Sequence, residues 1–140
     1  MSVRMDATEL NAFMAREFAQ VAAFYRVERV SPMQADVRLL VGERHLRPGG
    51  TISGPSMFEL ADLAMYAVTL AMIGPVALAV TTNASIDFMR KPAAGRDLIG
   101  RARLLKLGRS LAVGDVMIVN EGAEDVLARA SLTYAIPPQR

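Results

Sequence analysis

The chain has no cysteine and only one histidine among its 140 residues. Without cysteine the protein has no disulfide and no thiolate metal site, which is compatible with the cytoplasmic location that we expect. The single histidine, His45, lies in a polar stretch and has no partner at the spacing of a metal site or a catalytic triad. We therefore expect His45 to be exposed, and we expect neither a metal nor a separate cofactor.

Aromatic residues and concentrated charge are also scarce. Aromatic residues make up 6% of the chain, and the 16 lysines and arginines are dispersed, with a formal net charge of +2. This composition predicts no nucleic-acid-binding surface, whereas a local basic rim for a phosphorylated small molecule fits it. The N-terminus has no apolar signal-peptide core. A hydrophobic content of 52% suffices for the core of a single domain over residues 1–140.

One uncharged run, from Leu63 to Ile86, exceeds the ~20 residues that span a bilayer. We nevertheless predict no membrane span, because Gly74-Pro75 interrupts the run and four polar residues occupy its second half, Thr81, Thr82, Asn83 and Ser85. A buried helix, a turn and a strand account for the same residues.

Residues 53–73 (SGPSMFELADLAMYAVTLAMI) predict one long, mostly apolar helix around which the chain is organised. Such a helix is about 30 Å long. Its polar side chains recur every three or four residues and form one narrow stripe, where we expect the chemistry to lie. These side chains are Glu59, Asp62, Tyr66 and Thr69.

The start of this helix carries its own signals. Pro55 suits the first turn, where its missing N–H has no intrahelical partner. Ser56 and Glu59 have the spacing of a capping box, and Ser53 is the rival cap. The preceding glycine-rich turn, 47–54, leaves backbone N–H groups open to a polarised oxygen at the helix N-terminus.

The remaining segments predict an N-terminal helix within residues 1–20 and six strands. The strands are expected at 21–30, 33–41, 76–90, 97–107, 111–120 and 126–136. Alternation in the third strand puts Val80, Thr82, Ala84, Ile86 and Phe88 on the face toward the long helix, so that the Thr82 hydroxyl lies on the buried side near Asp62. Short turns favour antiparallel pairing, and only the long helix is apolar enough to cover the sheet. The predicted fold class is α+β.

Two motifs resemble the PaaI-like branch of acyl-CoA thioesterases. In that branch a turn of the form Asn-x-x-Gly-x-x-His-Gly-Gly precedes the helix, and an acidic residue follows its His by nine positions. Here the turn reads RPGGTISGP over 47–55, and Asp62 follows Ser53 by nine. Residues 85–93 (SIDFMRKPA) are similar to the strand ending in Phe-Leu-Arg-Pro-Ala, with Lys91 inserted, and Gly108-Arg109 is similar to the turn that follows. The resemblance covers residues 21–136.

The resemblance implies a hotdog fold, in which a curved antiparallel sheet wraps around a long central α-helix, and hydrolysis of an acyl-CoA or related thioester. It implies that the Gly54 N–H stabilises the oxyanion, that Asp62 is the nucleophile or the general base, and that Thr82 positions water. Coenzyme A would be part of the substrate. Such folds form homodimers, and often dimers of dimers, with the site between subunits.

Further residues are candidates for binding the substrate. The cations expected at the coenzyme A phosphates are Arg90, Lys91 and Arg109. The candidates near the thioester and acyl group are Ser53, Pro55, Glu59 and Tyr66. For Glu59 a capping role is the alternative, and for Tyr66 and Thr69 the alternative is packing.

The sequence also departs from the family pattern. Ser53 replaces the His, Arg47 replaces the Asn, and Pro55 replaces the second Gly and has no N–H to donate. A slow thioesterase is consistent with these changes, as is a non-catalytic protein that binds acyl thioesters. A purely structural dimer, with Asp62 paired to an arginine of the partner, is a third alternative. A dehydratase fits less well because His45 is poorly placed to pair with the acid.

Overall fold

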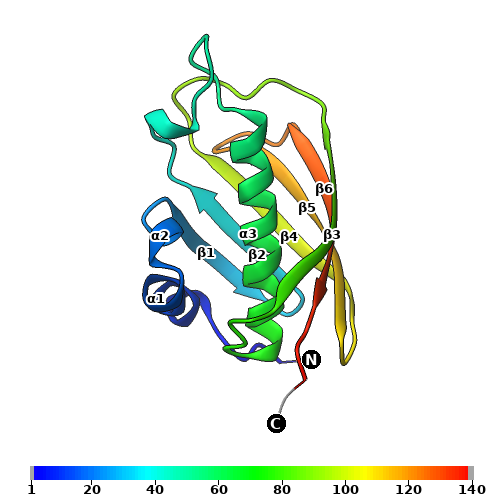
Figure 1. Cartoon of the computed structure of the whole chain (residues 1–140). Coiled ribbons are helices and arrows are strands. Elements are labelled where there is room, and N and C mark those ends of the chain that lie inside the picture. Colours follow the sequence, from blue (N-terminus) through cyan, green and yellow to red (C-terminus); the bar gives the residue numbers. More distant parts are fainter. Residues whose placement is uncertain (1, 139–140) are drawn as a thin grey trace.

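A curved six-stranded antiparallel sheet wraps around one long helix, α3 (Gly54–Ile73), in the computed structural model, which describes residues 2–138 (Figure 1). The strand order is β1-β2-β4-β5-β6-β3. The strands are β1 (Tyr25–Ser31), β2 (Gln34–Leu39), β3 (Val80–Phe88), β4 (Leu98–Leu107), β5 (Leu111–Asn120) and β6 (Ala128–Ala135). This arrangement confirms the predicted α+β class with a sheet curved around a central helix.

Helix α3 is buried over most of its circumference because the sheet surrounds it. Its small residues Ala61, Ala64 and Ala67 are fully buried and let the strands approach closely. By length and composition α3 could cross a membrane, but 72% of its 18-residue apolar segment is buried inside this fold. That burial is typical of the core helix of a domain.

The N-terminal segment forms two helices where the sequence predicted one. Helix α1 (Ala7–Glu17) begins with a capping box between Asp6 and Glu9, and α2 (Ala19–Ala22) follows a break at Phe18. The Asn11 side chain joins α1 to β1, because it donates to the Val27 carbonyl at 2.9 Å and accepts from the Val27 N–H at 2.8 Å. Both helices lie at the β1 side of the molecule (Figure 1).

One position of β5 lies so close to the β4 backbone and to α3 that it admits only glycine. A Cβ on Gly114 would lie 2.5 Å from the Arg103 carbonyl oxygen and 2.9 Å from Met65 Sδ. We expect Gly114→Ala to lower the free energy of unfolding by about 2–4 kcal/mol, because backbone in the β4–β5 ladder would have to move. Urea denaturation measures this loss.

Gly42→Ala is the matched control, because the nearest atom to its added Cβ, His45 Nδ1, is 3.9 Å away. We expect this variant to unfold within about 0.5 kcal/mol of the parent. Equal stabilities of Gly114→Ala and the parent would show that β5 can move away from α3.

Candidate active site

The start of α3 presents a free backbone amide at Gly54. Ser53 is the cap: its side-chain oxygen accepts from the Ser56 N–H at 3.2 Å, and its own N–H donates to the His45 carbonyl at 2.8 Å. Pro55 occupies the first turn, as predicted. As the first helical residue, Gly54 has an N–H without an intrahelical acceptor.

A cavity of about 470 Å³ opens beside this amide. Its basic side chains are Arg47, Arg90 and Lys91, and none of these takes part in the salt bridges formed within residues 2–138. The Phe88 ring forms part of its wall and lies 3.4 Å from where a Cβ on Gly54 would be. The cavity therefore combines a free amide, an apolar wall and a cationic rim.

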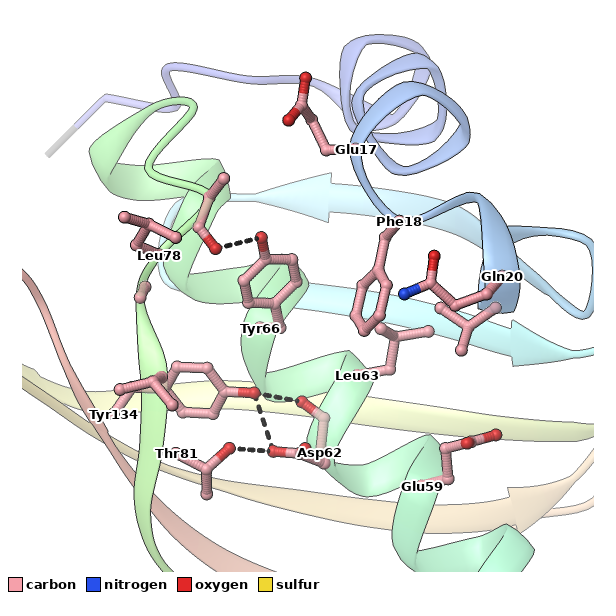
Figure 2. A pocket seen from close by; sticks show the side chains of 14 residues that line it. Glu17, Phe18, Gln20, Glu59, Asp62, Leu63, Tyr66, Leu78, Thr81 and Tyr134 are labelled. Carbon is pink, nitrogen blue, oxygen red and sulfur yellow. Dashed lines mark hydrogen bonds between the residues drawn. The ribbon is translucent and has the colours of Figure 1, made fainter.

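The Asp62 carboxylate is held by two hydroxyl groups from the sheet (Figure 2). Thr81 Oγ1 donates to Asp62 Oδ1 at 2.6 Å. The Tyr134 hydroxyl, from β6, lies 2.8 Å from the same Oδ1 and 3.0 Å from the Asp62 carbonyl oxygen. Helix α3 and two neighbouring strands therefore meet at one carboxylate oxygen.

Thr82 does not face Asp62, so its predicted position is wrong. The β3–β6 register shifts between Thr81 and Asn83, which makes Thr82 the extra residue of a bulge. Its hydroxyl donates to the Thr133 carbonyl at 3.3 Å, on the exposed side. The bulge turns Thr81 inward in its place, while Ala84 and later residues keep the predicted face.

A second cavity, of about 500 Å³, lies over Asp62 between the end of α1, α2, the middle of α3 and the start of β3. Figure 2 shows the Asp62 carboxylate and the rings of Phe18, Tyr66 and Tyr134 around it. The Tyr66 hydroxyl donates to the Ala77 carbonyl at 3.0 Å, and burial raises the pKa of Tyr66. Thr69, by contrast, is fully buried and donates to the Met65 carbonyl.

Glu59 is not a capping residue here. Its Oε1 accepts a hydrogen bond from the Tyr25 hydroxyl at 2.5 Å, and burial together with this carboxylate raises the pKa of Tyr25. Glu59 lines the same cavity as Asp62 but points to another side in Figure 2.

His45 is buried, with 1% of its surface exposed, so the expectation that it is exposed is wrong. The short helix η1 (Glu43–His45) turns the ring inward, where Nδ1 accepts from the Gly42 N–H at 2.9 Å and the ring packs edge-on against Phe24. Burial, and next the charge of Arg44, lower the pKa of His45. The neutral imidazole therefore stabilises the segment that leads into the Gly54 turn.

This lowered pKa predicts a pH dependence of stability. As the pH falls below about 6.5, the unfolded chain binds a proton at His45 before the folded protein does, so stability decreases until the pH reaches the folded pKa. In His45→Asn the side-chain oxygen can still accept from Gly42, and no group titrates. We expect the unfolding free energy from urea denaturation to fall less between about pH 7 and pH 5 in this variant than in the parent. Equal slopes would mean that His45 does not contribute.

The candidate site residues divide between two ends of the molecule. Gly54 and Asp62 are eight residues apart on one helix, which separates them by about 12 Å along its axis. Arg90 and Lys91 lie with Gly54 at the Phe88 end of β3. Arg109 lies at the other end, because the turn that contains it leads into Leu111, which pairs with Ala135, and Ala135 pairs with Val80. One chain therefore does not bring all of them together.

Residues 2–138 contain no group of three or more His, Asp or Glu side chains that could hold a metal ion. The sequence did not predict that the hydroxyl groups of Thr81 and Tyr134 donate to Asp62. Tyr134 lies within the last predicted strand, 126–136, and only its distance to Asp62 identifies its contact.

Comparisons with known proteins agree with this geometry. The sequence model of the Thioesterase superfamily matches residues 49–127. A relative from Archaeoglobus fulgidus, named "Putative esterase", is 31% identical over 108 residues, which cover 77% of this chain and 68% of the relative.

Solved structures extend the match to the fold. A "putative thioesterase" from Silicibacter sp. is 54% identical with a TM-score of 0.92, covering 99% of this chain and 96% of the other. A mutant of the phenylacetic acid degradation protein PaaI from Thermus thermophilus is 29% identical with a TM-score of 0.72, covering 84% and 97%. The segment matched by the family model contains both Gly54 and Asp62. The chain belongs to the thioesterase superfamily, as a hydrolase of its PaaI-like branch with the hotdog fold.

Proposed function

We propose that the protein hydrolyses an acyl-CoA thioester and that its active site is shared between two copies of the chain. The observation that carries this proposal is the Asp62 carboxylate, which lies in a cavity wall, bonds to hydroxyl groups of Thr81 and Tyr134, and forms no salt bridge within residues 2–138. A carboxylate without a cationic partner remains able to accept a proton from water.

A homodimer through β3 explains how the two ends of the site meet. β3 is an edge strand of the sheet, and exposed apolar side chains lie along it and beside its ends: Leu78 (81% exposed), Val80, Phe88 and Met89. An unpaired edge with apolar side chains favours pairing with another strand. Antiparallel pairing of two β3 strands about a two-fold axis brings the Phe88 end of one chain to the Val80 end of the other.

This pairing would complete the site in two places. Gly54 of one subunit would approach Asp62 of the other, although the same two residues are too far apart within one chain for a single carbonyl group to contact both. Arg109 would likewise approach the rim formed by Arg90 and Lys91 of the partner copy. With Arg47, four cations would then lie at one rim, which suits the phosphates of coenzyme A.

The chemistry assigned to these residues is the attack of water on the thioester carbonyl carbon. Asp62 accepts a proton from the water while the water oxygen bonds to the carbonyl carbon. The Gly54 N–H of the other subunit donates to the oxyanion that forms. When the intermediate collapses, the C–S bond breaks and the proton passes to the departing thiolate. Direct attack by the carboxylate, followed by hydrolysis of an anhydride, would use the same residues.

The test is the release of free thiol from a panel of short, long and aryl acyl-CoA thioesters, with N-acetylcysteamine thioesters of the same acids as a comparison. We expect turnover of at least one acyl-CoA, and a higher KM for its truncated analogue, because the analogue lacks the phosphates that the cationic rim would bind. Similar KM values for both would contradict the role of the rim.

A non-catalytic acyl-thioester-binding protein is the second candidate. It is favoured by Pro55, which has no N–H, and by Ser53, whose hydroxyl is occupied by Ser56 at 2.9 Å. Saturable binding of acyl-CoA without thiol release in any member of the panel would support this alternative over the enzyme.

A further inference from the structure

Two donors converge on one of the two oxygens of the Asp62 carboxylate. The Thr81 hydroxyl and the Tyr134 hydroxyl both contact Oδ1, at 2.6 Å and 2.8 Å. The hydrogen bonds formed within residues 2–138 include none to Asp62 Oδ2. The carboxylate therefore has one occupied oxygen and one that is available beside the cavity.

Tyr134 reaches this position from the core of the sheet. Its side chain is 3% exposed, and its ring lies 6.1 Å from that of Tyr66. Packing alone would be satisfied by phenylalanine, whereas the hydroxyl contacts both Oδ1 and the carbonyl oxygen of Asp62. One hydroxyl hydrogen cannot fully satisfy two acceptors, and the contact with the charged Oδ1 is the shorter one.

We infer that Tyr134 is a positioning residue for thioester hydrolysis: with Thr81 it fixes Oδ1, so that Oδ2 is the oxygen that accepts the proton from water. This inference rests on the proposed function. A carboxylate that is held at one oxygen cannot rotate freely about its Cβ–Cγ bond, so the other oxygen keeps one direction toward the attacking water.

The phenol is suited to hold this geometry without exchanging protons with the substrate. Burial, and next the charge of Asp62, raise the pKa of Tyr134 well above its ordinary value. The hydroxyl therefore stays protonated throughout the range in which thioesterase activity would be measured. It acts as a permanent hydrogen-bond donor, while Asp62 is the group that would accept the proton from water.

The test is Tyr134→Phe, which removes one oxygen atom and keeps the ring. We expect kcat to fall about 10-fold to 100-fold, as for the loss of one hydrogen bond to a charged group, with KM within about twofold of the parent. A fall in kcat per folded molecule with an unchanged KM is a result that a mere loss of folded protein would not give.

Tyr25→Phe is the matched control. It removes another buried phenol that donates to a carboxylate of α3, but the acceptor is Glu59. We expect its kcat and its KM within about threefold of the parent. A purely structural role of Tyr134 would lower the amount of folded Tyr134→Phe protein and leave its kcat per folded molecule at the parent's value.

Two results separate this inference from the proposed function. If the parent hydrolyses thioesters and Tyr134→Phe shows the parent's kcat, the positioning role is wrong although the function stands. If the parent hydrolyses nothing, the proposed function fails. A proton NMR signal from a slowly exchanging Tyr134 hydroxyl, absent in Tyr134→Phe and shifted in Asp62→Asn, then supports the predicted bond to Asp62. A signal that Asp62→Asn does not shift, or no signal at all, overturns the inference.

Discussion

Asp62→Asn is expected to lower kcat for thioester hydrolysis by about 10² to 10⁴-fold, the range for the loss of a general base. Asparagine keeps an oxygen that can accept from Thr81 and Tyr134 at their present distances, so the fold and the cavity should be retained. The amide cannot take a proton from water, which is why kcat falls. Steady-state thiol release measures the loss, and urea denaturation checks that the variant is folded.

Glu59→Gln is the control for this substitution. Glu59 is three residues away on the same helix, lines the same cavity, and is bonded to Tyr25. We expect its kcat within about tenfold of the parent, because the carboxylate is already engaged and points away from Asp62. Comparable activity of Asp62→Asn and the parent would exclude Asp62 from the chemistry.

Gly54→Pro is expected to lower kcat by about 10² to 10³-fold, the cost of removing one oxyanion donor. The substitution removes the N–H, and proline is well tolerated in the first turn of a helix. The preceding Ser53 has φ −75° and ψ 154°, which is the conformation that a residue before proline adopts. Residue 54 itself precedes Pro55, and a residue before proline avoids the helical conformation unless it is glycine. The loss is therefore assigned to the missing donor when circular dichroism shows the parent's helix content.

Gly54→Ala is the control, because it keeps the amide and adds a Cβ at ordinary contact distance, 3.4 Å, from Phe88. We expect Gly54→Ala to lose less than about tenfold in kcat. Equal activities of the proline and alanine variants would show that the Gly54 amide does not bind the oxyanion.

Mixing the two inactive variants shows which chain supplies each group. If Asp62 and Gly54 act across the interface, a dimer of one Asp62→Asn chain and one Gly54→Pro chain contains one intact site, and an equimolar mixture recovers about a quarter of the parent activity. If both groups act within one chain, no intact site forms and the mixture stays inactive.

Much of the architecture follows from patterns that are local in the sequence. The apolar run over 53–73 predicted α3 because a helix this apolar must be surrounded, and Ser53 and Pro55 marked its start. Alternation predicted the strands, because side chains of a half-buried strand alternate between two environments. The nine-residue spacing from Ser53 to Asp62, through the resemblance to the PaaI-like branch, pointed to Asp62 and to the neighbouring Gly54 before the fold was known.

The remaining features depend on contacts between segments that are distant in sequence. A bulge in β3 turned Thr81 toward Asp62 in place of Thr82, and alternation cannot reveal one extra residue whose pairing partner lies in β6. The His45 environment is built by Phe24 and Gly42, which fold over the ring only in the tertiary structure. Composition and periodicity by themselves therefore determined the helix, the sheet and the polar stripe that contains Asp62. Packing across the sheet decided which hydroxyl groups hold that acid, because hydrogen bonds depend on positions in space.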